Sequence, residues 1–259
     1  MCGIAALLLY PQERSSRQWH EIATLFTRNL IHNEVRGPVA TGLALLQWDG
    51  QIAVHKMPLS ATQFVRTAEY RALLARMDAR TTIVLGHTRL PTKGDPLDNA
   101  NNHPLHVGPV WGVHNGHIHN DDELFARYGY TRQAEVDSEI IFQLLAEITP
   151  MSSDTYLQSI AQRLQLLNGD FTFLAWDRRA PTKLLVFRQN NPLCVHWHIE
   201  WNALIFSSSY VFLRQTFGYS VRTEMLPRYR FLLFDALALP QNGLRPVAVQ
   251  SLPQSPAPL

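Results

Sequence analysis

The second residue of this 259-residue chain is a cysteine, and its position gives it two groups that could do chemistry. Once Met1 is removed, Cys2 carries a thiol and a free α-amine on the same Cα atom. The thiolate is the nucleophilic form of cysteine, whose ordinary pKa is about 8.5. An α-amino group has a pKa of about 7.7–8.0 and can accept that proton near neutral pH. Cys2 therefore combines a nucleophile with its own base, although an inert buried cysteine that opens a strand is an alternative interpretation.

Five polar motifs follow Cys2 along the chain, and each contains residues able to bind or polarise a substrate. Arginine offers a planar fork of donors to a carboxylate, an aspartate can pair with an ammonium group, and an asparagine amide can stabilise an oxyanion. The motifs are Arg36-Gly37-Pro38, the segment 86–92 (Gly-His-Thr-Arg-Leu-Pro-Thr), Asn102-His103-Pro104, His114-Asn115-Gly116 and Asp137-Ser138-Glu139. Two motifs have simpler interpretations, because Asn-Gly is typical of a hairpin turn and Asp137 could merely cap a helix.

A group of histidines between residues 103 and 119 raises a metal-dependent hydrolase as a rival hypothesis. His117 and His119 alternate and would share one face of a strand. The segment lacks an established zinc spacing such as His-Glu-x-x-His, and no carboxylates are interleaved with its histidines. We therefore predict a reaction that needs no metal and no cofactor.

The composition limits the class of protein. Hydrophobic residues make up 46% of the chain and charged residues 17%, which is typical of a soluble globular protein, and the net charge is only +2. No block of basic residues favours nucleic acid or an anionic membrane surface, and no apolar run approaches the ~18 residues that span a bilayer. The two cysteines, Cys2 and Cys194, form no disulfide framework, and Cys194 is interpreted as a buried inert thiol. We expect a cytoplasmic protein that binds neither nucleic acid nor membrane.

Apolar periodicity and turn signals predict the elements that must position the polar motifs. Helices are expected to begin near Ser15, Ser60, Asp121, Asp137 and Ser152, with a short one at 210–217. The helix from Ser60 is expected to reach about Arg76. Strands are predicted at 3–9, 41–48, 51–56, 81–87, 110–114, 171–176, 184–188, 193–198, 203–207 and 230–235. Residues 91–109 form a long polar segment of the kind that is functional or disordered, and the proline-containing end of the chain is expected to be loosely held.

In type and order, Cys2 and the five motifs resemble the glutaminase domain of class II glutamine amidotransferases. These are N-terminal-nucleophile enzymes such as glucosamine-6-phosphate synthase and asparagine synthetase. The resemblance extends from Cys2 to about Ser209 and implies an α/β (α+β) fold of four layers, αββα, with two mostly antiparallel sheets between helices. It implies a glutaminase domain over residues 1–239, followed by the tail at 240–259.

The resemblance also implies the chemistry. Cys2 would attack the side-chain amide carbon of the substrate glutamine and release ammonia, and water would hydrolyse the resulting glutamyl thioester. The α-amine would take the thiol proton and return it to the leaving group. The side-chain NH₂ of Asn115 and the backbone N–H of Gly116 would form the oxyanion hole.

Substrate recognition follows from the same resemblance. Arg89 would hold the α-carboxylate of glutamine, with Thr92 adding a hydroxyl donor, and Asp137 would pair with the α-ammonium group. Arg36 and His103 would support the site without touching the reacting atoms.

Two positions depart from the family pattern, and alternatives stay open. Val39 stands where the family usually has an aspartate, and Leu90 where some members have a tryptophan. The chain could instead hydrolyse another γ-glutamyl amide, or be a silent domain that binds glutamine or regulates a partner. Because no phosphate-binding glycine-rich loop and no ammonia-using domain is recognisable, we expect a free-standing subunit that delivers ammonia to a separate synthase or ligase.

Overall fold

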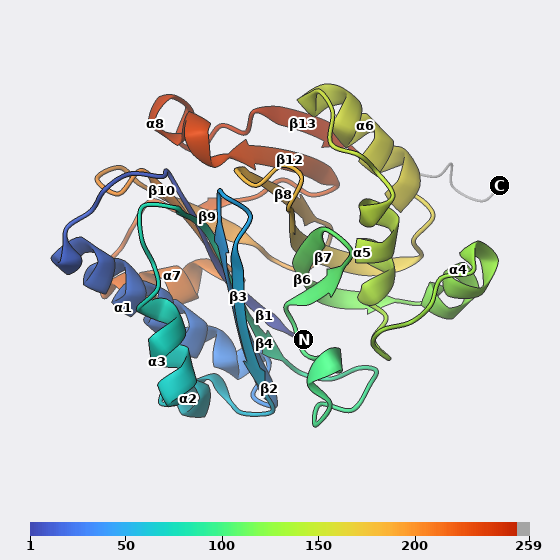
Figure 1. Cartoon of the computed structure of the whole chain (residues 1–259), viewed down its shortest axis with the longest axis horizontal. Coiled ribbons are helices and arrows are strands. Elements are labelled where there is room, and N and C mark those ends of the chain that lie inside the picture. Colours follow the sequence, from blue (N-terminus) through green and yellow to red (C-terminus); the bar gives the residue numbers. More distant parts are fainter. Residues whose placement is uncertain (253–259) are drawn as a thin grey trace.

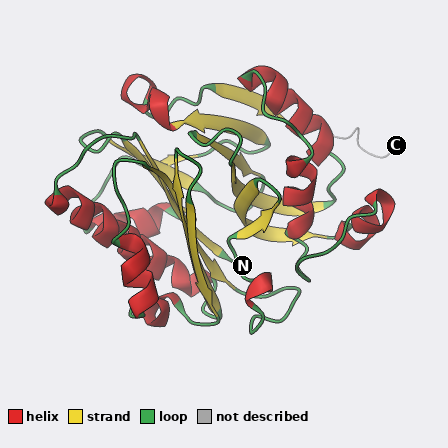
Figure 2. Cartoon of the chain, in the orientation of Figure 1, coloured by secondary structure: helices red, strands yellow, loops and turns green. Residues whose placement is uncertain are grey.

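The computed structural model describes residues 1–252 as four layers, with two sheets packed face to face and helices on both outer sides (Figures 1 and 2). The first sheet has the strand order β11-β9-β10-β1-β4-β2-β3, and the second has the order β13-β12-β8-β7-β6-β5. Neighbouring strands are antiparallel in both sheets. The predicted αββα sandwich is confirmed.

The first sheet is built around its amino-terminal strand. Its strands are β1 (Gly3–Leu9), β2 (Ala40–Gln47), β3 (Ile52–Met57), β4 (Thr81–Arg89), β9 (Cys194–His198), β10 (Ala203–Ser207) and β11 (Glu224–Met225). All seven residues of β1 are buried, as its unbroken apolar run predicts for a strand covered on both faces. β1 lies between β10 and β4, so the first residues of the chain sit in the middle of the sheet.

Four helices cover the outer face of the first sheet: α1 (Ser16–Asn33), α2 (Ala61–Phe64), α3 (Ala68–Leu74) and α7 (Tyr210–Phe217). Ser15 caps α1, and a reciprocal bond with Gln18 completes a capping box. The prediction of one helix from Ser60 to Arg76 was wrong, because Thr67 accepts the N–H of Tyr70 and starts a new helix. A 3₁₀ turn, η1 (Glu34–Arg36), follows α1 and leads into β2.

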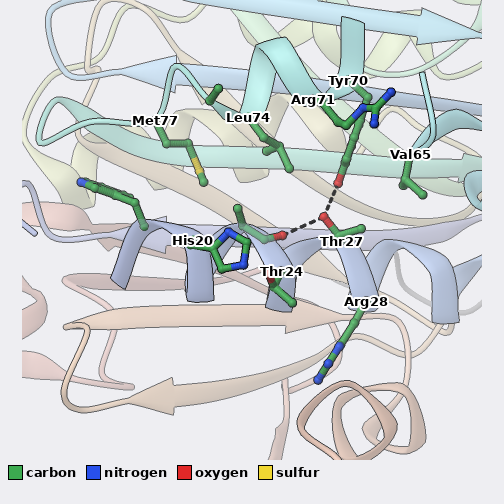
Figure 3. Close-up of a pocket in the computed structure, with 12 residues that line it drawn as sticks. His20, Thr24, Thr27, Arg28, Val65, Tyr70, Arg71, Leu74 and Met77 are labelled. Carbon is green, nitrogen blue, oxygen red and sulfur yellow. Dashed lines mark hydrogen bonds between the residues drawn. The ribbon is translucent and has the colours of Figure 1, made fainter. Parts of the chain in front are cut away.

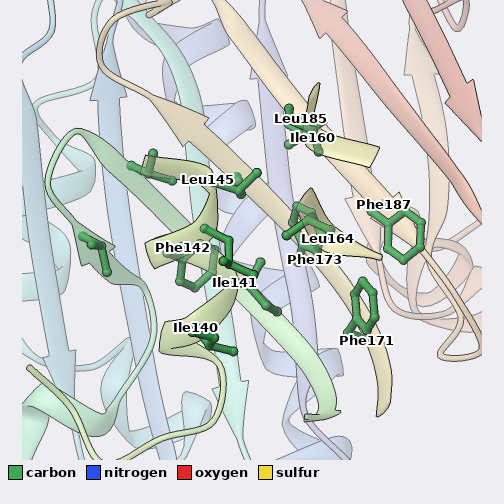
Figure 4. Packing of buried hydrophobic residues seen from close by; sticks show 14 of the residues in the cluster. Ile140, Ile141, Phe142, Leu145, Ile160, Leu164, Phe171, Phe173, Leu185 and Phe187 are labelled. Carbon is green, nitrogen blue, oxygen red and sulfur yellow. The ribbon is translucent and has the colours of Figure 1, made fainter. Parts of the chain in front are cut away.

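The second sheet carries its own helices. Its strands are β5 (Leu105–Val107), β6 (Val110–Ile118), β7 (Gly169–Asp177), β8 (Lys183–Arg188), β12 (Arg230–Asp235) and β13 (Ala248–Ser251). The helices α5 (Glu139–Ala146) and α6 (Ser153–Leu164) pack apolar side chains such as Phe142 and Leu164 against aromatic residues of β7 and β8, including Phe173 and Phe187 (Figure 4). α4 (Asp121–Tyr128) ends at Gly129 in the left-handed conformation, as predicted.

The sheets meet in a separate apolar core. Ile4 and Leu8 of β1 face Val113 of β6 and Trp176 of β7 in this layer, and all four side chains are fully buried. This core fixes the first sheet against the second. Residues on the two sheets can therefore form one site where the sheets meet.

One of the two expectations about irregular segments needs correction. Residues 91–109, expected to be functional or disordered, contain a 3₁₀ turn η2 (Asn99–Asn101) and the strand β5. The end of the chain is not loosely held up to residue 252, because a 3₁₀ turn η3 (Ala236–Ala238) and α8 (Leu239–Asn242) lead into β13, which pairs with β12. Residues 253–259 lie outside the described part, and the division into 1–239 and 240–259 stays a prediction.

Candidate active site

The amino-terminal end of β1 lies beside the carboxyl end of β4. The two strands are antiparallel, and Gly3 pairs with Thr88, so Cys2 comes next to Arg89 and Leu90. The Cys2 thiol donates to the Leu90 carbonyl at 3.6 Å. A Cβ atom at Gly3 would lie 2.5 Å from the Thr88 hydroxyl, so this close approach requires glycine.

The second sheet brings an asparagine to the same point. The backbone N–H of Cys2 donates to Asn115 Oδ1 at 3.1 Å, across 113 residues of sequence. On the opposite side, Arg36 Nε donates to the Cys2 carbonyl at 2.8 Å. Both backbone polar groups of Cys2 are thus held, and the orientation of its side chain is restricted. Arg36 has the supporting position predicted for it.

Cys2 lies in a small pocket that collects most of the predicted site residues. Residues from five separate segments line it: Cys2, Arg89, Leu90, Thr92, Lys93, His103, His114, Gly116, Val136, Asp137 and Ser138. Burial raises the pKa of the Cys2 thiol above its ordinary value, and the positive charge of Arg89 opposes that rise. The resting group is therefore a protonated thiol that needs a base to become a nucleophile.

Asn115 and Gly116 do not form the hairpin turn that their sequence suggests. They lie inside β6, where both pair with β7. Gly116 has φ of +152°, and a Cβ atom there would lie 1.8 Å from the Asp170 carbonyl, so glycine is required. Asn115 is fully buried, and its Nδ2 has no hydrogen-bond partner among residues 1–252. Because Oδ1 accepts from Cys2, the remaining NH₂ is a buried donor without an acceptor.

Arg89 is buried and held by the loop that follows β4. Its Nη1 donates to Asn102 Oδ1 at 2.8 Å, and its Nη2 donates to the carbonyls of Lys93 at 2.7 Å and Gly94 at 3.0 Å. A guanidinium has five N–H donors, so donors remain for a ligand in the pocket. Burial lowers the pKa of Arg89, and the nearby Cys2 and Asp137 oppose the shift.

Asp137 is not the plain helix cap that its position suggested as an alternative. The residue at the cap of α5 is Ser138, and no side chain makes a capping bond there. Asp137 Oδ2 accepts the backbone N–H of Ile118 at 2.7 Å, which ties the start of α5 to β6. The pocket therefore contains a buried carboxylate and a buried guanidinium, the charges that a free amino acid requires.

Three histidines are packed below the pocket. The rings of His87 and His103 lie 4.3 Å apart, His87 Nε2 donates to the His114 carbonyl at 2.9 Å, and His114 Nδ1 lies 2.7 Å from the Ser138 hydroxyl. Burial lowers the pKa of all three, that of His87 to about 3. They are neutral near pH 7 and lie in the supporting position predicted for His103. In the described chain, no group of three or more His, Cys, Asp or Glu side chains is arranged to hold a metal ion.

Sequence reasoning missed several residues that build this site. Asn102 holds Arg89, and Ser138 holds His114; both stood in recognised motifs but without an assigned role. No local sequence pattern indicated a role for Lys93, because its partner carboxylates come from α4. The Nζ atom of Lys93 lies 2.6 Å from Asp121 and 2.9 Å from Asp122. These ion pairs hold the loop after β4, which lies over the pocket, against α4.

The two departures from the family pattern lie beside the site. Val39 donates its N–H to the Arg89 carbonyl at 3.1 Å, so the residue in place of the usual aspartate borders the strand that carries the arginine. Leu90 contributes its carbonyl to the thiol contact, while its side chain is partly exposed. Thr92 lies on the exposed rim of the pocket.

A four-layer sandwich with a cysteine at the start of a central strand defines an N-terminal-nucleophile hydrolase. Comparisons with known proteins identify the family within this class. The family model described as "Glutamine amidotransferase domain" matches residues 87–215. Glutamine–fructose-6-phosphate aminotransferase (isomerizing) of Corynebacterium efficiens is 31% identical over 201 residues, which are 75% of this chain and 31% of that protein. The Vibrio cholerae protein of the same name is 26% identical over 250 residues, covering 93% of this chain and 38% of its own length.

Solved structures agree in fold. Glutamine phosphoribosylpyrophosphate amidotransferase from B. subtilis, complexed with ADP and GMP, matches with a TM-score of 0.70 and 17% identity over 98% of this chain and 50% of that one. The chain belongs to the class II glutamine amidotransferases. It spans roughly a third of the length of the curated relatives it matches.

None of the helices within residues 1–252 is both long and apolar enough to span a bilayer.

Proposed function

We propose that this chain hydrolyses the side-chain amide of glutamine through a thioester on Cys2. The observation that carries the proposal is the arrangement of Asn115. Its Oδ1 holds the backbone nitrogen of Cys2, while its Nδ2 is a buried donor with no partner in the described chain. A buried donor without an acceptor is costly unless a ligand or reaction intermediate supplies one.

The reaction steps follow from these contacts. After Met1 is removed, the Cys2 nitrogen is an amine, and it takes the thiol proton. The sulfur attacks the amide carbon, and Asn115 Nδ2 and the Gly116 N–H donate to the oxyanion. The amine then protonates the leaving nitrogen, the C–N bond breaks and ammonia departs. A water molecule, giving its proton to the amine, attacks the thioester carbon and releases glutamate and the thiol.

The charged residues of the pocket favour a substrate with a free amino-acid end. Arg89 would bind the α-carboxylate with its remaining N–H donors, assisted by the Thr92 hydroxyl. Asp137 would bind the α-ammonium group through the oxygen that Ile118 does not occupy.

The ammonia would pass to a separate synthase or ligase. This part of the proposal is supported by the names of the relatives, which are aminotransferases. Ammonia released in a buried pocket would otherwise be lost to solvent as ammonium.

Labelling with a diazo-ketone analogue of glutamine, read by intact mass, tests the proposal. We expect loss of Met1 and one adduct on Cys2 that excess glutamine prevents, and no adduct on Cys2→Ala. A chain that has lost Met1 but takes up no label, alone or in cell extract, would overturn the proposal in favour of a silent binding domain. If intact mass shows that Met1 is still present, an aminopeptidase is used to remove it before labelling, so that Cys2 carries its free α-amine.

A further inference from the structure

A groove between α1 and α3 lies on the outer helical layer, on the side of the first sheet away from the second sheet (Figures 1 and 3). This groove is larger than the pocket at Cys2. Its walls are mainly apolar, from Trp19, Ala23, Val65, Leu74, Ala75 and Met77. None of these residues takes part in the site described above.

The floor of the groove contains one hydrogen bond between the two helices. Thr27 Oγ1 donates to the Ala23 carbonyl at 2.7 Å and lies 2.7 Å from the Tyr70 hydroxyl (Figure 3). Since the Thr27 proton is used within α1, Tyr70 is the donor of the second bond. The helices are therefore held at their spacing, and the groove is a permanent feature of the surface.

The rim of the groove is positively charged. Arg28 on α1 and Arg71 on α3 border it from opposite helices, and neither lies within ion-pair distance of a carboxylate in the part of the chain described. No acidic residue lines the groove. Segments 16–33 and 61–77 together contain five arginines and two glutamates, a charge of +3 in a chain whose total is +2.

We propose that this α1–α3 groove binds an amphipathic helix of a partner protein, with apolar side chains in the groove and carboxylates on its flanks. The residues of α1 that line the groove run from Trp19 to Arg28, which at 1.5 Å per residue is about 13 Å. That length accommodates about two and a half turns of helix, the span of anchors at i, i+3 or i+4, and i+7. Arginines on both walls match an occupant with acidic groups on both flanks, whereas a single-headed amphiphile would leave one unpaired.

The inference does not depend on the glutaminase proposal. It concerns the outer helical layer, and Arg28 and Arg71 make no contact with the residues around Cys2. Circular dichroism serves as the control for an intact fold in the groove variants, so the test does not need Cys2 to react.

A pair of synthetic peptides tests the proposal on the full chain. Both are 15-residue helices with leucines at i, i+4 and i+7; one has glutamates on the flanks and the other has lysines at the same positions. Binding is followed by fluorescence anisotropy at low and high salt. We expect the acidic peptide to bind at least about tenfold more tightly than the basic one, with the difference shrinking as salt rises.

Matched variants locate the binding. The double charge reversal R28E/R71E changes two exposed residues and should invert the preference between the peptides. Ala75→Trp places a large side chain in the groove from an exposed position. It should weaken binding of the acidic peptide at least about tenfold. A second hollow beside α1 shares His20, Thr24 and Arg28 with the groove, but Tyr219 lines only the second hollow, so Tyr219→Ala should change nothing.

Three results would each overturn the proposal. These are no binding of the acidic peptide at about millimolar concentration, equal binding of both peptides, and binding that R28E/R71E and Ala75→Trp leave unchanged. Binding of dodecanoate in the groove without binding of the acidic peptide would assign it to a small amphiphile instead.

Discussion

Replacing Asn115 tests the catalytic geometry most directly, because its amide has two separable tasks. Oδ1 accepts from the Cys2 nitrogen at 3.1 Å, and Nδ2 is buried without a partner in residues 1–252. Asn115→Ala removes both groups. Asn115→Asp keeps an oxygen for the Cys2 amine and replaces the donor with a second acceptor of nearly the same size.

The expected loss is large and falls on kcat. Removing one oxyanion donor costs about 2.7–4 kcal/mol of transition-state stabilisation, or a factor of about 10²–10³ in kcat. Asn115 is fully buried, so water has no room to replace the missing donor. The loss of kcat in the alanine variant should therefore lie near the upper end of that range, at about 10³. The aspartate variant should be at least as slow, because a carboxylate would repel the oxyanion. KM should change little, since Arg89 and Asp137 bind the other end of glutamine.

The assay is glutamate release at saturating and limiting glutamine for both variants, after intact mass has shown that Met1 is absent. Circular dichroism confirms that the fold persists. An aspartate variant with nearly wild-type kcat would show that only the acceptor matters and would refute the oxyanion assignment. A change confined to KM would refute it as well.

Three further predictions follow from the same site. Cys2→Ala should abolish glutamate release while leaving the urea midpoint within error, because the thiol makes only one long contact, to Leu90; residual turnover would point to another nucleophile. Arg89→Lys should raise KM at least about tenfold with a smaller effect on kcat, since lysine cannot reproduce the planar fork, and an unchanged KM would contradict the carboxylate role. Acid should destabilise the fold, because His87 has a pKa of about 3 in the folded state and an ordinary pKa of 6.5 in the unfolded state. Below pH 6.5 the unfolded state therefore binds more protons than the folded state, and the free energy of unfolding falls as the pH decreases from 6.5 towards 3. At pH 5 this one histidine costs about 2 kcal/mol, which urea unfolding at pH 7.5 and 5 should detect and which His87→Gln should remove.

The sequence predicted the elements whose signals are local. The apolar run of β1 indicated a strand buried on both faces, Ser15 indicated the start of α1, and the predicted strands 41–48 and 51–56 correspond to β2 and β3. Each of these depends on residues next to one another in the chain. The order of the polar motifs also predicted which residues would gather around Cys2.

Other features depend on tertiary contacts and were beyond local signals. Asn115-Gly116 has the strongest turn propensity in its segment, yet pairing with β7 keeps both residues in a strand. Asp137 precedes a helix as a cap would, but a backbone N–H of β6 takes its carboxylate. Lys93 gains its role only because α4 approaches the loop after β4. In each case the competing partner is distant in sequence.

The site joins the two sheets, and this explains why its residues are so dispersed along the chain. The nucleophile and Arg89 belong to the first sheet, whereas Asn115 belongs to the second and Asp137 is fastened to it. Their separation is therefore set by the apolar layer between the sheets, in which Ile4 and the residues around it are fully buried. Close-packed interiors resist small displacements, so the core that stabilises the fold also holds the Cys2 nitrogen 3.1 Å from Asn115 Oδ1. Stability and catalytic geometry share one structural cause.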